Sequence, residues 1–193
     1  MLQALPVFAL TGNIVLSYNL IFLSTFVLSA LGVFLFVRAL TGMPAAAFLA
    51  GLAFAYAPYR IPQFSHLQVI SSFWMPFALL GLRRFFETGR SRALVGGSAA
   101  LVLQNLSCGY YLLFFPPFFA AYAVYEMAHR RLIGNWRTWR ALLVAAAGVA
   151  VLTWPFVAPY LDLRRSRGDV GVRPLQEVVQ YSADVYSFGT ASA

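Results

Sequence analysis

The chain has 193 residues, of which 61% are hydrophobic and 10% are charged. Soluble domains are about 45–50% apolar and about 25% charged, so this composition excludes an ordinary soluble domain, and it also excludes a disordered chain. The 14 basic residues, all arginine, outnumber six acidic ones and give a net charge of +8. In so apolar a chain this excess indicates membrane topology rather than nucleic-acid binding. The single cysteine, Cys108, excludes an internal disulfide and a multi-cysteine metal site.

Long uncharged stretches separate the arginines, and they predict six membrane-spanning helices, because a spanning helix needs about 20 apolar residues. The predicted passes are residues 13–37, 40–58, 64–82, 93–108, 110–128 and 141–160. We therefore predict an all-α, polytopic transmembrane helix bundle over residues 1–160, followed by an extracytoplasmic tail over 161–193.

The fourth and fifth passes divide one uncharged stretch, residues 93–125. A single pass would place the arginines of 83–92 and those of 129–140 on opposite faces of the membrane, against the positive-inside rule. Two passes place both arginine-rich loops in the cytoplasm and the tail outside. Each half is short, so two full passes and two re-entrant helices within a larger assembly both remain open.

The tail also contains a residue pattern that predicts a helix. Pro174 suits the first turn of a helix, and Leu175, Val178, Val179 and Val185 then recur near helical spacing. This pattern predicts a short amphipathic helix on the outer surface. Arg173 immediately precedes it and could bind an anion at the start of that helix.

Polar residues within the predicted membrane core are few. No Asp, Glu, Lys or Arg lies there, which disfavours a proton or ion pump. Glu126 at an inner helix end predicts an interfacial ion pair near His129 and Arg130. Gln104 and Asn105 face the predicted outer turn, where they either contact a ligand or join neighbouring helices.

The loop at residues 59–66 is the densest polar feature on the predicted outer face. Arg60 there either snorkels to the membrane surface or binds an anionic headgroup through its fork of donors. His66 either is a satisfied interfacial histidine or donates to a phosphate. Tyr110 and Tyr111 lie beside the outer turn and either anchor the helix at headgroup level or contact a sugar.

Five segments of the chain follow one another in a characteristic order: NLIFLSTFVLSALGVFLFVRALTG (19–42), AGLAFAYAPYRIPQFSHLQ (50–68), WMPFALLGLRRFF (74–86), QNLSCGYYLLFF (104–115) and WPFVAPYLDLRR (154–165). This order resembles bacterial polytopic glycosyltransferases of the GT-C superfamily, the class that includes protein mannosyltransferase-like enzymes. The resemblance implies an all-helical protein of the bacterial cytoplasmic membrane. It also implies transfer of a sugar from a polyprenyl-phosphate donor at the outer face.

In that superfamily an acidic residue of the first external loop usually serves as the catalytic base, and the helix before that loop has no counterpart here. The resemblance therefore implies an internal or truncated piece, with catalytic residues unknown and a base from upstream sequence or a partner chain. Together the two lines of reasoning predict a set of donor-binding residues: Arg60, His66, Gln104, Asn105, Tyr110, Tyr111 and Arg173.

No metal or cofactor is expected beyond the lipid-linked sugar, and the expected partners are membrane lipid and polyprenyl-phosphate sugar, not nucleic acid. Two other functions stay open. One is a lipid-carrier binding or transport subunit without transfer chemistry, and the other is a structural membrane subunit.

Overall fold

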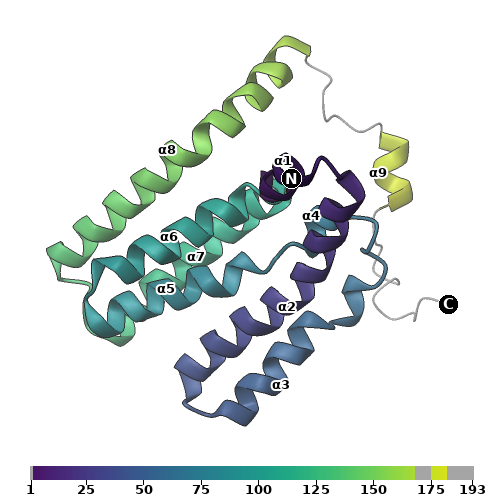
Figure 1. The fold of residues 1–193 in the computed structure, drawn as a ribbon. Helices are drawn as coiled ribbons and strands as arrows, with labels where there is room; N and C mark the ends of the chain where they lie inside the picture. Colours follow the sequence, from purple (N-terminus) through teal and green to yellow (C-terminus); the bar gives the residue numbers. More distant parts are fainter. Residues whose placement is uncertain (1, 168–174, 182–193) are drawn as a thin grey trace. The chain divides into compact units, whose positions relative to one another are not determined.

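The computed structural model describes residues 2–167 and 175–181, and every regular element within these ranges is helical, as predicted (Figure 1). The elements in chain order are η1 (Leu2–Ala4), α1 (Leu5–Thr11), α2 (Ile14–Thr41), α3 (Pro44–Ala55), η2 (Pro58–Arg60), α4 (Leu67–Ile70), α5 (Trp74–Thr88), α6 (Ser91–Asn105), α7 (Gly109–His129), α8 (Trp136–Arg167) and α9 (Leu175–Tyr181). The chain divides into two units, residues 1–154 and 155–193, and the bundle described below is the first.

Local sequence explains where several helices begin and end. The side chain of Asn13 accepts a hydrogen bond from the backbone N–H of Leu16 at 2.9 Å and so caps the start of α2. Gly12, Gly42 and Gly89 end α1, α2 and α5 with φ values of 62°, 70° and 67°. These values lie in the left-handed region, where glycine has no Cβ to clash.

Residues 106–108 interrupt the long uncharged stretch and separate α6 from α7. The prediction of two helices over residues 93–125 is therefore confirmed. α7 continues through Pro116 and Pro117 without a break. A short helix, α9, also occurs where the tail predicts one, although Arg173 and Pro174 lie outside the described residues.

The prediction of a continuous helix over residues 64–82 is wrong. α4 is a single turn, and an irregular segment separates it from α5. Side chains of later helices bind the carbonyl groups here: the Tyr111 hydroxyl donates to the carbonyl of Val69, and the Gln104 amide donates to that of Ser71. Because these carbonyls have partners, the backbone can leave the helical conformation without orphaned polar groups.

Helix length limits how many elements can cross a membrane. α2 and the Trp136–Leu163 part of α8 are long and apolar enough to do so. α3, α5 and α6 contain 12, 15 and 15 residues. They reach about 18 to 22 Å, short of the ~30 Å hydrocarbon core. α7, with 21 residues, is long enough but not apolar enough. Among the described residues, length and composition therefore support two spans where the sequence predicts six.

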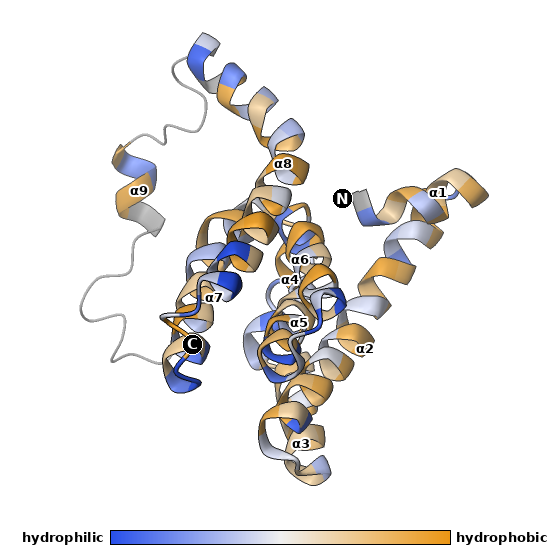
Figure 2. Cartoon of the chain, turned by 90° about the vertical axis from the view of Figure 1, so that its left-hand side faces the viewer, coloured by the Kyte–Doolittle hydropathy of each residue, from blue (hydrophilic) through white to orange (hydrophobic). Residues whose placement is uncertain are grey.

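Large apolar side chains cover much of the bundle surface. Hydrophobic residues predominate along most of the helices of the bundle (Figure 2). Val27 of α2, Phe114 of α7 and Val151 of α8 are 65%, 68% and 69% exposed. Only 22% of the most apolar window of α2, and 6% of that of α8, is buried within the structure. The core helix of a soluble protein would be mostly buried, whereas exposed apolar surface on this scale marks a membrane or protein contact.

Small residues set the closest helix contacts. α3 packs along α2, α6 packs along α5, and α2 and α7 both contact α5. A Cβ atom on Gly81 of α5 would lie 2.4 Å from the Cα of Gly97 on α6, and one on Gly51 of α3 would lie 2.6 Å from the carbonyl oxygen of Ala30 on α2. Only glycine permits these approaches, which are typical of helix pairs that associate within membranes.

Candidate functional site

Polar groups from several elements converge at one end of the bundle, which we call the polar end. It comprises Arg60 of η2, Ser71 and Ser72 between α4 and α5, Gln104 and Asn105 at the end of α6, Ser107, and Tyr111 at the start of α7. The hydrogen bonds from Tyr111 to Val69 and from Gln104 to Ser71, the latter at 3.1 Å, join α7 and α6 to the same segment. The Gln3 amide of η1 donates to the hydroxyl of Ser107 and ties the start of the chain to this end.

Arg60 is 1% exposed and lies against α2. Its two terminal nitrogens donate to the carbonyl of Thr25 at 3.2 Å and to the hydroxyl of Ser29 at 3.5 Å. The guanidinium carbon lies 5.2 Å from the centroid of the Phe26 ring, within cation–π range. Of the two alternatives for Arg60, snorkelling to the membrane surface is therefore wrong, because the charged group is buried against a neighbouring helix.

The position of Arg60 along α2 differs from the predicted outer loop. Thr25 and Ser29 follow the first residue of α2, Ile14, by about 17 and 22 Å. Since the whole helix is about 42 Å long, Arg60 binds near its middle. The reason is the shortness of α3, which returns only part of the way along α2 before the chain turns at Tyr56.

Burial lowers the pKa of Arg60 from its ordinary value, and the nearby Tyr59 and Tyr111 act in the opposite direction. An arginine starts from so high a value that its side chain stays charged at neutral pH. The structure therefore holds a desolvated positive charge beside two tyrosines.

Gln104 and Asn105 are both buried, at 0% and 7% exposure. The Nδ2 of Asn105 donates to the hydroxyl of Thr153 on α8 at 3.5 Å. The side-chain oxygen of neither residue has a hydrogen-bond partner among the described atoms. Each residue thus joins helices through its nitrogen and leaves one acceptor unused.

Three predicted site residues are not brought into this cluster. His66 is exposed, and its Nδ1 lies 3.1 Å from the hydroxyl of the adjacent Ser65. Tyr110 is 61% exposed, unlike its neighbour Tyr111. Arg173 lies outside the described residues.

The polar end also concentrates unsatisfied polar atoms. The buried side-chain atoms without a partner among the described residues are Gln3 Oε1, Arg60 Nε, Ser72 Oγ, Trp74 Nε1, Gln104 Oε1 and Asn105 Oδ1. A buried polar atom without a partner costs about 1–3 kcal/mol, so most native proteins contain few of them. The group contains both donors and acceptors, which is the capacity that a polar ligand or ordered water would use.

A second cluster lies where α5 and α7 end, and we call it the charged end: Arg83, Glu87, Glu126 and Arg130. Glu126 is 2% exposed and pairs with Arg83 at 3.0 Å and with Arg130 at 2.7 Å. Tyr122 also donates to Glu126 at 2.7 Å.

The sequence predicts the pair of Glu126 with Arg130, and the structure confirms it, whereas His129 stacks on Tyr125 instead. The sequence did not predict that Arg83 and Glu87 also form ion pairs in this cluster. Their i,i+4 spacing on α5 is a signal that could have revealed half of the network, but the contact between α5 and α7 leaves no local trace in the sequence.

The four charges of this cluster cancel, so other arginines carry the net positive charge of that region. The arginines of that region that form no ion pair with a described residue are Arg38, Arg84, Arg90, Arg92, Arg131, Arg137 and Arg140.

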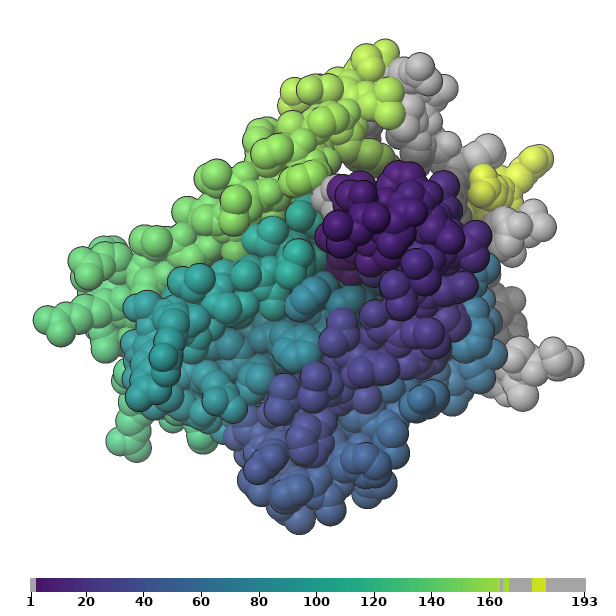
Figure 3. Space-filling model, in the orientation of Figure 1, coloured from purple at the N-terminus to yellow at the C-terminus, as the bar shows by residue number. Residues whose placement is uncertain are grey.

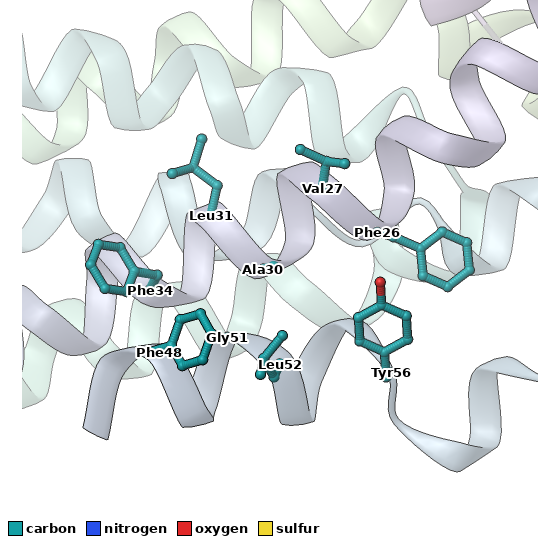
Figure 4. A pocket seen from close by; sticks show the side chains of 9 residues that line it. All are labelled: Phe26, Val27, Ala30, Leu31, Phe34, Phe48, Gly51, Leu52 and Tyr56. Carbon is teal, nitrogen blue, oxygen red and sulfur yellow. The ribbon is translucent and has the colours of Figure 1, made fainter. Parts of the chain in front are cut away.

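An apolar groove of about 440 Å³ follows the contact between α2 and α3 (Figure 4). Aromatic rings line both of its ends, with Phe34 and Phe48 at one end and Phe26 and Tyr56 at the other. Because the ring of Phe26 also contacts Arg60, this end of the groove adjoins the buried charge.

No protein-family model, curated protein or solved structure gave a match to this chain.

Proposed function

We propose that the chain is a membrane-embedded part of a glycosyltransferase and binds the polyprenyl-phosphate sugar donor. The single observation that carries this proposal is the aromatic groove between α2 and α3, which ends at a ring in contact with the buried Arg60. A long isoprenoid chain needs such an apolar groove, and a phosphate needs a fixed positive charge at its end. The order of sequence segments that resembles GT-C enzymes supports the same reading.

In the proposed arrangement, α2 and α8 cross a bacterial cytoplasmic membrane. The short helices α3, α5 and α6 are half-embedded, which is tolerated where neighbouring helices cover the irregular backbone between them. The charged end and the arginines of that region that form no ion pair face the cytoplasm, in agreement with the positive-inside rule, and the polar end opens toward the outer side. Of the four other predicted passes, those at 40–58, 64–82 and 93–108 correspond to these partial helices, and the pass at 110–128 corresponds to α7.

At the proposed site, the prenyl chain lies in the groove and its phosphate meets Arg60. The Nε–H of Arg60 has no partner among the described residues and can donate to the phosphate. An acceptor hydroxyl attacks the sugar and gives its proton to a base from elsewhere. The bond between the sugar and the phosphate then breaks, the phosphate leaves with the bonding electrons, and the positive charge of Arg60 stabilises it. The unused oxygens of Gln104 and Asn105 accept hydrogen bonds from sugar hydroxyls.

A second candidate function, donor-lipid binding without transfer, is favoured by the position of the acidic residues. Within residues 2–154 the two carboxylates are Glu87 and Glu126, and both belong to the charged end. Neither can act as a base at the polar end. We therefore propose that this chain binds the sugar donor and that the catalytic base comes from elsewhere.

The groove is tested by lipid binding to the purified chain in nanodiscs, measured by native mass spectrometry. We expect retention of polyprenyl phosphate in preference to the uncharged polyprenol. Leu52→Trp fills the groove from α3 and lowers binding about tenfold, or ~1.4 kcal/mol. Leu49→Trp, on the same helix but outside the groove, is the matched control and leaves binding unchanged.

Arg60→Met tests the charge, because it retains an apolar side chain of similar length and removes the guanidinium. The variant leaves no unpaired charge buried at this position, and its melting temperature checks that the fold is kept. Binding of polyprenyl phosphate should fall to the level of polyprenol. Equal binding by the wild-type chain and this variant would remove the assignment of Arg60.

Transfer itself is measured in membranes that contain the chain and radiolabelled polyprenyl-phosphate mannose. Binding together with release of label into a water-soluble product supports the glycosyltransferase. Binding without release supports the second candidate. Neither binding nor release contradicts both and leaves a structural subunit.

A further inference from the structure

α6 and the part of α8 before Trp154 lie side by side (Figures 1 and 3). A groove of about 510 Å³ runs between them. Its walls are mainly apolar, with Leu94, Val95 and Val102 from α6 and Val144 and Leu152 from α8. This groove shares no lining residue with the one proposed for the donor.

The two faces of α6 differ in how closely neighbours approach. Toward α5, a Cβ atom on Gly97 would lie 3.0 Å from the carbonyl oxygen of Ala78, so the backbones are in contact. Toward α8, the groove is lined by small residues, Ser98 and Ala99 on α6 and Gly148 on α8. A Cβ atom on Gly148 would meet nothing within 4 Å. The small residues on this face therefore leave space between α6 and α8 instead of bringing the two helices into close contact.

Positive charge lines one end of the groove. Arg137 and Arg140, at the start of α8, belong to its lining together with Ser91, the first residue of α6. Both arginines are exposed and make no ion pair within the described part of the chain. The nearby acids Glu87 and Glu126 are already engaged by Arg83 and Arg130. The positive charge at the groove end is therefore not neutralised by those acids.

The backbone at the start of α8 does not supply the binding groups. The side-chain oxygen of Asn135 accepts from the backbone N–H of Arg137 at 3.0 Å and from that of Thr138 at 3.4 Å. This cap satisfies two of the free N–H groups of the first turn. Any anion at this end must therefore bind the arginine side chains.

We propose that this groove binds one anionic phospholipid, with an acyl chain between α6 and α8 and the phosphate on Arg137 and Arg140. Charge complementarity selects this occupant, because an apolar groove that ends at two unpaired arginines matches an acyl chain that ends at a negative headgroup. From Arg140 to Leu152 the groove follows α8 for about 18 Å, which is slightly more than half of a ~30 Å hydrocarbon core. The acyl chain of a lipid in one leaflet of a membrane is about that long. The proposal does not depend on the glycosyltransferase assignment.

The test uses the full chain in nanodiscs that contain equal amounts of phosphatidylglycerol and phosphatidylcholine, with bound lipid counted by native mass spectrometry. We expect one retained phosphatidylglycerol per chain. The double variant Arg137→Gln/Arg140→Gln lowers its retention about tenfold and leaves phosphatidylcholine unchanged. The control Arg38→Gln/Arg84→Gln removes two exposed arginines that do not line the groove, and it retains phosphatidylglycerol.

A second pair of variants tests the apolar part. Gly148→Leu places a side chain in the groove without a clash, so it lowers lipid retention while the melting temperature is kept. Gly96→Leu on the exposed side of α6 is the control, since it also meets open space but lies outside the groove. Equal retention of both lipids by the wild-type chain, or full retention by Gly148→Leu, would overturn the proposal.

Discussion

The two ends of the bundle treat their polar groups in opposite ways. At the charged end, the buried carboxylate of Glu126 is bound by two arginines and a tyrosine, and the four charges cancel. At the polar end, within the part of the chain that the structure describes, Arg60 has one unused donor, and Gln104 and Asn105 each have one unused acceptor. A saturated network stabilises a fold, whereas an unsaturated one retains binding capacity at a cost in stability. The comparison therefore separates a structural end from a candidate binding end.

The largest expected effect tests the structural end. Glu126→Gln leaves Arg83 and Arg130 without their shared buried partner, so we expect a loss of about 3–5 kcal/mol in the free energy of unfolding. Glu87→Gln, which removes a more exposed partner of the same arginines, should cost less than about 1 kcal/mol. Chemical denaturation in detergent micelles measures both. Equal effects would show that the network is not centred on Glu126.

A second prediction concerns the contact between α5 and α6, the helices that connect the two ends. Gly97→Ala places a Cβ atom 3.0–3.1 Å from backbone atoms of α5 and should cost about 1–3 kcal/mol. The adjacent Gly96→Ala meets open space and should stabilise the helix by about 0.5–1 kcal/mol. Opposite shifts of the thermal midpoint for these neighbours are expected. Shifts of the same sign would contradict the close approach.

The smallest effect is expected at the polar end. The buried hydroxyl of Ser72 has no partner among the described residues, so Ser72→Ala loses no hydrogen bond and should leave the free energy of unfolding unchanged or raise it by up to about 1 kcal/mol. Ser71→Ala removes a hydrogen bond from the side chain to the carbonyl of Leu67 at 2.8 Å and should cost about 1 kcal/mol. A larger loss for Ser72→Ala would show that its hydroxyl has a partner and would weaken the contrast between the ends.

Sequence reasoning predicted the helices that have strong local signals. The fifth pass at residues 110–128 matches α7 closely, because a turn precedes it and charged residues follow it. The third pass failed because absence of charge does not distinguish a helix from an irregular segment. The carbonyls of that segment are satisfied by Tyr111 and Gln104, about 40 and 30 residues later in the chain, and such long-range bonds leave no periodic pattern.

The sequence predicted which residue types belong to the candidate site, but it did not predict how they are arranged in space. Arg60, Gln104 and Asn105 stand out as polar residues in an apolar chain. The burial of Arg60 against Thr25 and Ser29 depends on the length of α3 and on where the backbone turns after it. Those features follow from packing between helices, which the uncharged stretches alone do not encode.

The pair Pro116–Pro117 within α7 has a mechanical consequence. Neither residue has a backbone N–H, so the carbonyls of Leu112 and Leu113 lack the donors that a regular helix would supply. α7 therefore bends more readily at this turn than elsewhere along its length. The segment before the prolines carries Tyr111, and the segment after them carries Glu126. A hinge at this turn lets the first segment change its tilt while the second keeps its ion pairs.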